Sequence, residues 1–310
     1  WIKKGEWHNE SYSSQLKIID SSNSGEWVVH QLKVNQELAY IGSQLSGEGF
    51  KLSRDEADQY IKENPQCRRV IFPILRGEDI TNEPEQNAQQ LVINFYDWNE
   101  TKIADYSPCY DHVKERVYPE RQKVKRKIRR EKWWQYAEKC TNLYDAIASL
   151  DEVIVHPFTS KYICPSVVPA RQVFSAPMVV FTTASRSLLA CLQSIFHVEW
   201  VVANSSTMGE TQRYTPSDSL RTFPFPGNVE DNPNLHELGD KYHEFRTEIM
   251  LNEEIGTTDL YNRLHDEGDE SQYLHDIRDL HMKMDKAVAV VYGWDDLDLG
   301  HGFHETKQGI

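Results

Sequence analysis

The chain has 310 residues, a formal net charge of -14 at pH 7, 39% hydrophobic residues and 11% aromatic residues. This length supports one large domain or two modest ones, while a mean hydropathy of -0.64 and the lack of an apolar run of about 18 residues argue against a membrane protein. The five cysteines are widely spaced without a CxxC pair, which predicts neither a disulfide framework nor a zinc site and fits a reducing cytoplasm. The first residues, WIKKGEWHNE, carry neither a methionine nor a signal sequence, so we expect a fragment of a longer protein.

Residues 1–110 predict a β-containing N-terminal part. One helix is expected over residues 53–62, where Ser53 and Glu56 have the spacing of a capping box. Short β-like runs, separated by Ser, Asn and Gly clusters, are expected at residues 15–19, 27–32 and 91–95.

A strongly basic segment follows, in which residues 114–132 hold ten Lys or Arg residues against three acids. A helix with about 3.6 residues per turn would gather these cations along one face, a ridge that suits a phosphate backbone. The ridge would contain Arg121, Lys125, Arg129 and Lys132, with Arg126 and Arg130 beside them. The alternative is a solvated helix face that only keeps the protein soluble.

Two adjacent tryptophans, Trp133 and Trp134, end the basic segment. Their indoles could stack on bases or ribose. Neighbouring helical residues point about 100° apart, so we expect at least one of the two to anchor the helix to the core.

Residues 141–227 predict a turn-rich part with several strands and one apolar helix. The segments DEVIVHPF, SKYICPSVVP and QVFSAPMVVFTT read as strands joined by tight turns, and the helix expected over residues 185–202 is too apolar for an exposed surface. Ser160 and Lys161 lie in one turn, and Arg213 and Tyr214 follow a polar loop; both positions suit contact with phosphates or base edges. The alternatives are an ordinary polar turn and a flexible linker.

Residues 228–310 are acidic, with twenty Asp or Glu residues, and carry helical periodicity over residues 234–266 and 271–293. This pattern indicates a helical hairpin or small bundle that faces away from nucleic acid or lies against a basic partner. The overall prediction is an α+β fold, with a mixed β-containing recognition core flanked by helices and a mostly helical C-terminal part. We divide the chain into a first domain, residues 1–227 (parts 1–110, 111–140 and 141–227), and a C-terminal domain, residues 228–310.

Catalytic signatures are missing from the sequence, which contains no GxSxG, HExxH, GxxxxGK[ST] or GxGxxG. Asp97, Glu100 and Lys102 are too closely spaced for a nuclease site, and His301 with His304 is a weak metal pair. We therefore expect no catalytic, cofactor or metal site in this chain.

An ordered series of segments carries a resemblance along nearly the whole chain. The series is WIKKGEW (1–7), IGSQLSGEGF (41–50), FPILRGEDI (72–80), INFYDW (93–98), ERVYPERQKVKRKIRREKWWQYAEK (115–139), SK (160–161), LQSIFHVEWV (192–201), RYTPSDSLRTFPFP (213–226), YNRLHD (261–266) and YGWDDLDLGHGF (292–303). With this order the chain resembles the C-terminal target-recognition region of adenine-specific DNA methyltransferases of the type IIG and type IIL (MmeI-like) restriction-modification class and of BREX-type anti-phage methyltransferases.

The resemblance implies that a methyltransferase domain with bound S-adenosylmethionine belongs to the parent protein, because this chain lacks the (D/N/S)PP(Y/F) motif. The chain itself would read double-stranded DNA while the target adenine leaves the stack. Its partners would be duplex DNA, the parent's methyltransferase domain and other defence-system subunits. The candidate DNA-binding residues are Arg121, Lys125, Arg129, Arg130, Trp134, Ser160, Lys161, Arg213 and Tyr214.

Within this set, the basic segment should meet phosphates, whereas Lys161 and Arg213 are the better candidates for base edges. A second hypothesis is a protein-interaction module of a defence complex, in which the acidic tail and the basic segment recruit partners and DNA contact is incidental. A third, a metal-dependent nuclease, is disfavoured by the carboxylate spacing.

Overall fold

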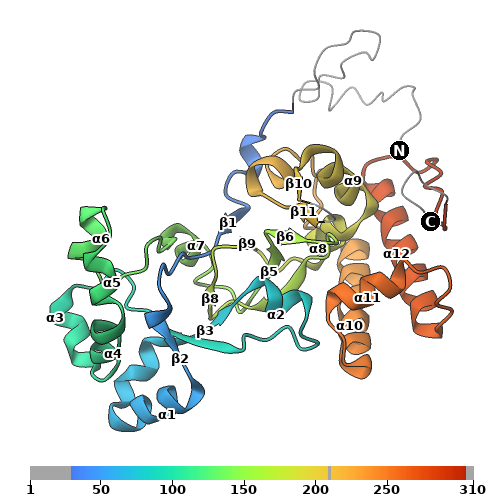
Figure 1. The fold of residues 1–310 in the computed structure, drawn as a ribbon. Helices are drawn as coiled ribbons and strands as arrows, with labels where there is room; N and C mark the ends of the chain where they lie inside the picture. The colour runs from blue at the N-terminus through green and yellow to red at the C-terminus, as the bar shows by residue number, and fades with distance from the viewer. Residues whose placement is uncertain (1–28, 209–210, 305–310) are drawn as a thin grey trace.

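The computed structural model describes residues 29–208 and 211–304. The molecule is elongated, with small helices at one end, β-sheets in the middle and long helices at the other end (Figure 1). The α+β prediction is confirmed. In the described part of the chain no helix is both long and apolar enough to cross a membrane.

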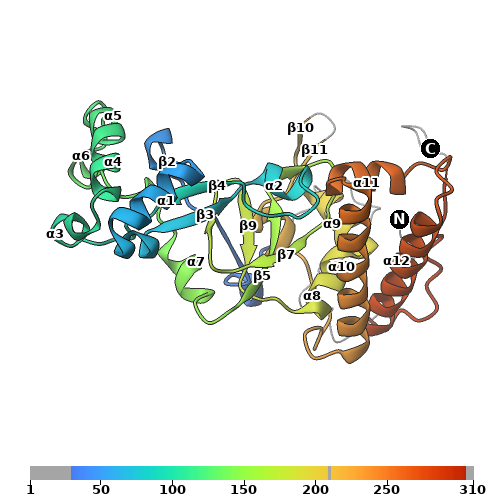
Figure 2. The same cartoon turned by 90° about the horizontal axis from the view of Figure 1, so that it is seen from below.

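Helices dominate the two ends of the molecule, as Figures 1 and 2 show. In the first half of the chain they are α1 (Arg54–Glu63), α2 (Gly77–Thr81), α3 (Glu100–Ile103), α4 (Cys109–Arg116), α5 (Tyr118–Gln122), α6 (Lys127–Glu131) and α7 (Thr141–Ala146). Toward the C-terminus they are α8 (Arg186–Gln193), α9 (Ile195–Asn204), α10 (Pro233–Glu253), α11 (Thr257–Leu264) and α12 (Gln272–Val291).

Three sheets occupy the middle of the molecule. The first has the order β1-β9-β5-β7 and is antiparallel; its strands are β1 (Ala39–Ile41), β9 (Met178–Phe181), β5 (Glu152–Pro157) and β7 (Ser166–Pro169). The second has the order β2-β4-β3-β8, with β3 and β8 parallel; its strands are β2 (Lys51–Leu52), β4 (Gln90–Ile93), β3 (Ile71–Leu75) and β8 (Val173–Phe174). The third has the order β10-β11-β6, from β10 (Thr207–Met208), β11 (Thr211–Arg213) and β6 (Thr159–Ser160).

Several predicted elements are confirmed. Ser53 and Glu56 form the expected capping box, because each side chain accepts a hydrogen bond from the other residue's backbone N–H. The strands predicted from the three apolar segments of residues 141–227 are β5 to β9. The run at residues 15–19 lies outside the described residues, and residues 29–32 form no strand.

The single basic helix is a wrong prediction, because the segment forms three short helices, α4, α5 and α6. Pro119 lies in the first turn of α5, where its missing N–H is tolerated, but it could not continue α4. The second break, before α6, is stabilised by Arg130, whose Nη1 donates to the carbonyl oxygens of Val124 and Lys125 at 2.8 Å each. The cations therefore do not form one ridge.

The apolar helix predicted over residues 185–202 is also divided, into α8 and α9. Ser194 has extended backbone angles and its hydroxyl donates to the Cys191 carbonyl at 2.7 Å. The N–H of Ile195, which starts α9, donates to the buried carboxylate of Asp285 at 2.9 Å. Side chains from α12 thus satisfy the helix start that the break exposes.

The largest hydrophobic cluster joins residues on both sides of position 227. It contains side chains of β5, β9 and α8 together with side chains of α10, α11 and α12. Gly239 lets α10 approach α8 closely, because a Cβ built at this glycine would lie 2.0 Å from the Arg186 carbonyl oxygen. The C-terminal helices therefore form one wall of the same core as the central sheet.

Candidate nucleic-acid interface

The two predicted recognition segments meet in the small sheet β10-β11-β6. Ser160 pairs with Gln212 and Thr159 pairs with Arg213, so segments about fifty residues apart in sequence become neighbours. Lys161 follows β6 directly, and Arg213 ends β11. Lys161, from the predicted turn, and Arg213, from the segment after the predicted polar loop, thus lie on one structural unit.

Lys161 and Arg213 are both exposed. The Arg213 guanidinium lies over the Phe158 ring, 5.6 Å from its centroid, which keeps its charge exposed and its stem packed. Lys161 Nζ donates to Asn262 Oδ1 at 2.7 Å. Neither cation has a carboxylate partner among the described residues, so both charges remain available to an anion.

Ser160 and Tyr214 are buried and support the sheet from behind, which corrects the prediction that their side chains touch DNA. The Ser160 hydroxyl donates to the Tyr162 carbonyl at 2.7 Å. Tyr214 is only 1% exposed, and its hydroxyl is hydrogen-bonded to His197 Nε2 at 3.0 Å. Burial raises the pKa of Tyr214 far above its usual value, so its hydroxyl stays protonated.

Two buried histidines complete the layer beneath the sheet. Burial lowers the pKa of His156 to about 4 and that of His197 to about 3. His156 Nε2 accepts a hydrogen bond from the Cys164 N–H, and its ring lies 4.5 Å from the Tyr214 ring between centroids. Both imidazoles are therefore neutral packing groups at pH 7.

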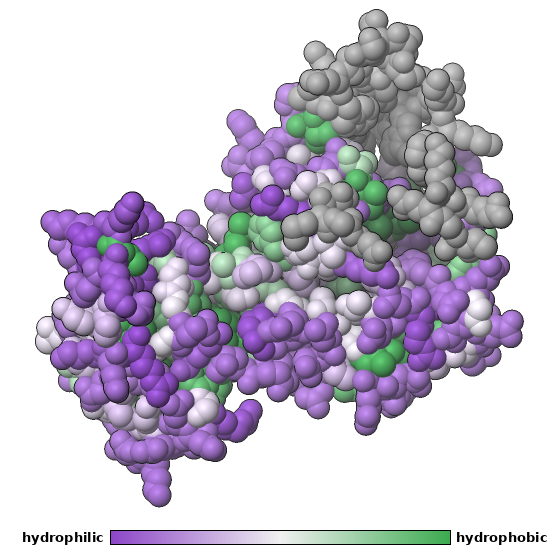
Figure 3. All heavy atoms as spheres, viewed as in Figure 1, coloured by the Kyte–Doolittle hydropathy of each residue, from purple (hydrophilic) through white to green (hydrophobic). Residues whose placement is uncertain are grey.

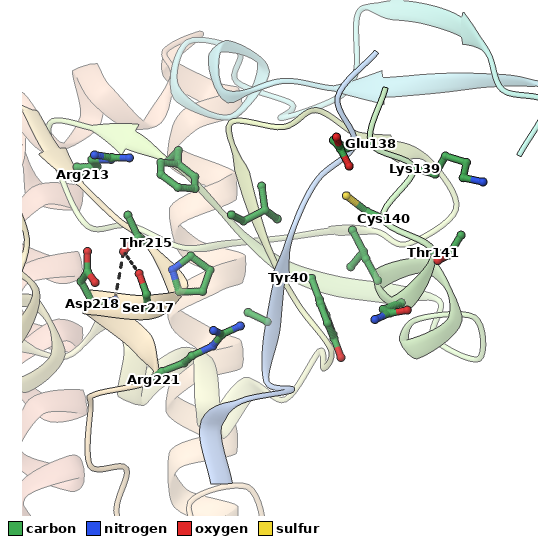
Figure 4. A pocket seen from close by; sticks show the side chains of 16 residues that line it. Tyr40, Glu138, Lys139, Cys140, Thr141, Arg213, Thr215, Ser217, Asp218 and Arg221 are labelled. Atoms are coloured by element: carbon green, nitrogen blue, oxygen red, sulfur yellow. Dashed lines mark hydrogen bonds between the residues drawn. The ribbon is translucent and has the colours of Figure 1, made fainter. Parts of the chain in front are cut away.

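An open groove of about 680 Å³ lies beside this sheet (Figure 4). One wall carries Arg213 together with Thr215, Ser217, Asp218 and Arg221, which belong to or cap the short π-helix Pro216–Leu220, as Figure 4 shows. The other wall carries Glu138, Lys139, Cys140 and Thr141, and Tyr40 of β1 lies between the walls. The wall with Arg213 is held in shape by the Thr215 hydroxyl, which accepts from the Asp218 N–H at 3.2 Å.

Arg221 is a candidate residue that the sequence reasoning missed. It lines the groove with Arg213, is partly exposed, and has no ion pair among the residues that the structure describes. The sequence feature that could have identified it is a second arginine eight residues after Arg213, directly before the proline-containing segment TFPFP. A two-arginine wall suits phosphate or guanine contacts better than Arg213 alone.

The predicted phosphate contact of Arg121 does not fit the burial of its side chain in this structure. Its side chain is 2% exposed, and Nη2 donates to the Leu45 carbonyl at 2.8 Å and the Gln135 carbonyl at 3.2 Å. Burial lowers its pKa. Arg121 therefore connects the basic segment to residues that precede and follow it, as a structural brace.

The other cations of the basic segment differ in how many of their donors remain free to bind an anion. Arg129 shares Glu138 with Arg126, at 3.2 and 3.3 Å, and Arg130 binds backbone carbonyls, so part of their donor capacity is already used. Lys125 is exposed and makes no ion pair within the described part of the chain. The exposed cations of this segment are Lys114, Arg116, Lys123, Lys125, Arg126, Lys127 and Lys132. Figure 3 shows hydrophilic residues over most of this end of the molecule.

Both tryptophans are buried, which confirms the anchoring role and corrects the assignment of Trp134 as a stacking platform for DNA. Trp134 Nε1 donates to the Trp98 carbonyl at 2.9 Å, and the two indoles meet edge to face at 5.6 Å. The two C-terminal histidines considered as a metal pair contact other groups. His301 Nε2 lies 2.9 Å from Asp285 Oδ2, and His304 Nε2 contacts the Gly300 carbonyl. The described residues include no group of three or more ligands arranged for a metal ion.

Comparisons with known proteins show which fold and family the chain shares. A solved structure of the Type IIL restriction-modification enzyme MmeI in complex with DNA has a similar fold, with a TM-score of 0.62 and 17% sequence identity. The similarity covers 86% of this chain and 34% of that chain, so the present chain spans about a third of the MmeI chain. No curated protein matches the sequence. The model of the family "MmeI, target recognition domain" matches residues 30–227, well over half of the chain, and the chain therefore belongs to this family.

Proposed function

We propose that this chain is the sequence-specific duplex DNA reader of a larger restriction-modification or anti-phage protein. The observation that carries the proposal is the sheet β10-β11-β6, which places Arg213 and Lys161 on one exposed unit next to a groove that also holds Arg221. Exposed cations with free donors on a rigid edge are suited to reading base acceptors in the major groove. Membership of a target recognition family supports this assignment.

The exposed cations of the basic segment supply the second part of the proposal. They lie at the opposite end of the molecule from α10 to α12, which belong to the acidic part at residues 228–310, so the charge of the chain is polarised along its length (Figure 1). We propose that these cations contact phosphates and set the register, while the sheet and groove read bases. The acidic helices then brace the reader instead of contacting DNA.

The catalytic partner in this proposal is an S-adenosylmethionine-dependent adenine methyltransferase domain of the parent protein. The parent would act in a bacterial cytoplasm, a compartment in which the five free cysteines of this chain stay reduced. The alternative, a protein-interaction module with incidental DNA contact, makes the opposite prediction for the charge variants below.

A charge-reversal experiment tests the proposal. Lys125, Arg126 and Lys127 are changed together to Glu, and affinity for a fluorescently labelled duplex is measured by anisotropy at several salt concentrations. The matched control reverses three exposed lysines of the acidic helices, Lys241→Glu, Lys283→Glu and Lys286→Glu.

The first variant should lose most duplex affinity and show a salt dependence reduced by about one unit of slope for each phosphate contact removed. The control should bind like the wild type. Equal effects of both triple variants, or wild-type binding that does not respond to salt, would favour the protein-interaction alternative.

A further inference from the structure

A residue of the C-terminal helices holds Lys161, although Lys161 itself belongs to the recognition part. Lys161 Nζ donates to Asn262 Oδ1 at 2.7 Å, across 101 positions of sequence. Asn262 lies in α11, beyond residues 30–227 that match the recognition family. The contact therefore connects a segment outside the recognition family to a candidate base-reading side chain.

The same amide oxygen also fixes the residue next to Lys161. Tyr162 donates its hydroxyl proton to Asn262 Oδ1 at 3.0 Å. The Tyr162 ring stacks on His265, with 5.1 Å between ring centroids and 20° between planes, and it contacts Tyr261 at 5.6 Å. Asn262 Oδ1 thus accepts hydrogen bonds from both residues that follow β6, Lys161 and Tyr162.

The acceptor is rigid, because α11 is anchored on two sides. Thr257 donates its hydroxyl proton to the Ile80 carbonyl at 2.8 Å, and both residues are buried. Leu260 and Leu264 point into the largest hydrophobic cluster. Lys161 itself is exposed, and Figure 2 shows its sheet on the side of the molecule where α11 lies.

We infer that Asn262 is a positioning residue for DNA recognition, which orients Lys161 for its contact with the duplex. The inference rests on the proposed function. An ammonium group has three donors, and Asn262 uses one, so two remain for a phosphate or base acceptor. A neutral amide holds the lysine and leaves its positive charge in place, whereas a carboxylate would cancel that charge. Ordering this long side chain before binding removes part of the entropic cost of the complex.

A double-mutant cycle tests the inference. Asn262→Ala, Lys161→Ala and the double variant are compared with the wild type in the full chain, with a labelled duplex pool of randomised central sequence as the probe. Asn252→Ala, which removes an exposed amide of α10, is the matched control. Thermal unfolding of each variant shows that the fold is retained.

Asn262→Ala should weaken binding by about 2- to 10-fold in the wild-type background, the range expected for ordering one long side chain. It should have no effect in the Lys161→Ala background, because its action passes through Lys161. Asn252→Ala should bind like the wild type. If Asn262→Ala unfolds the protein, the cycle is run with Asn262→Leu, which keeps the side-chain volume and lacks the acceptor, and is read in the same way.

Each contrary outcome has a distinct meaning. Equal weakening by Asn262→Ala in both backgrounds would assign it a purely structural role and overturn the inference. Unchanged affinity of Lys161→Ala would overturn the inference and leave the proposed function to the other cations. If the wild type binds no duplex, the proposed function and the inference both fail.

Discussion

Replacing Arg121 and Lys125 separately by Met tests whether the first is a structural cation and the second, as we propose, a DNA-binding one. Arg121 is buried and donates two hydrogen bonds to backbone carbonyls, whereas Lys125 is exposed. Met retains most of the length of either side chain and removes the charge and the donors. The two variants therefore remove the same kind of charge from two different environments.

The expected loss of folding stability in Arg121→Met follows from the contacts of the arginine side chain. Each hydrogen bond from a charged donor contributes about 1.5 to 3 kcal/mol, and two carbonyl oxygens lose their partner. The variant also no longer buries a cation that lacks a carboxylate partner among the described residues, which offsets part of the loss. We expect the free energy of unfolding to fall by about 2 to 4 kcal/mol for Arg121→Met and by less than about 0.5 kcal/mol for Lys125→Met.

Urea denaturation followed by tryptophan fluorescence measures the first quantity, because Trp133 and Trp134 lie in the cluster that Arg121 braces. Salt titration measures the phosphate contacts made in duplex binding. Lys125→Met should lower the slope of log affinity against log salt by about one unit, and folded Arg121→Met should not. The reasoning is refuted if Arg121→Met keeps its unfolding midpoint but loses salt-dependent binding.

Two further predictions concern the core. In the folded state the pKa values of His156 and His197 are about 4 and about 3, below the ordinary value of 6.5. The unfolded chain therefore binds more protons than the folded one at acidic pH. The stability that the two neutral histidines contribute is fully present above pH 6.5 and is lost as pH falls from 6.5 through the folded-state pKa values. The His156 contribution amounts to at most about 3 kcal/mol, and denaturation curves at about pH 7 and about pH 4.5 that coincide would contradict it. Gly239→Ala should destabilise the protein by about 1 to 3 kcal/mol, although alanine favours helices, because its Cβ would meet the Arg186 carbonyl at 2.0 Å. Gly77→Ala, whose Cβ would lie 3.4 Å from the Pro157 side chain, is the control, and equal melting temperatures for the two variants would show that α10 and α8 can move apart.

Local signals account for the elements that the sequence predicted correctly. The Ser53 and Glu56 cap depends on residues three positions apart, and β5 and β9 are runs of β-branched residues. The burial of Trp133 and Trp134 also follows from their size. The basic helix failed because charge density was given more weight than Pro119.

The candidate site depends on contacts that no local pattern contains. Arg121 is buried because it finds the Leu45 carbonyl 76 positions away, and Lys161 finds Asn262 101 positions away. The pairing of β6 with β11 brings Ser160 opposite Gln212. A sequence identifies which side chains could contact DNA, whereas the long-range pairing decides which of them remain exposed.

The central claim is sequence-specific reading of duplex DNA, and selection from a randomised duplex library tests it most directly. The wild-type chain should enrich one short sequence, and Arg213→Ala should lose preference at one or two positions of that sequence, because each bidentate base contact discriminates by about 1 to 3 kcal/mol. Binding without enrichment of any sequence, or an unchanged enriched sequence with both Arg213→Ala and Arg221→Ala, would contradict the assignment of this sheet and groove as the reader.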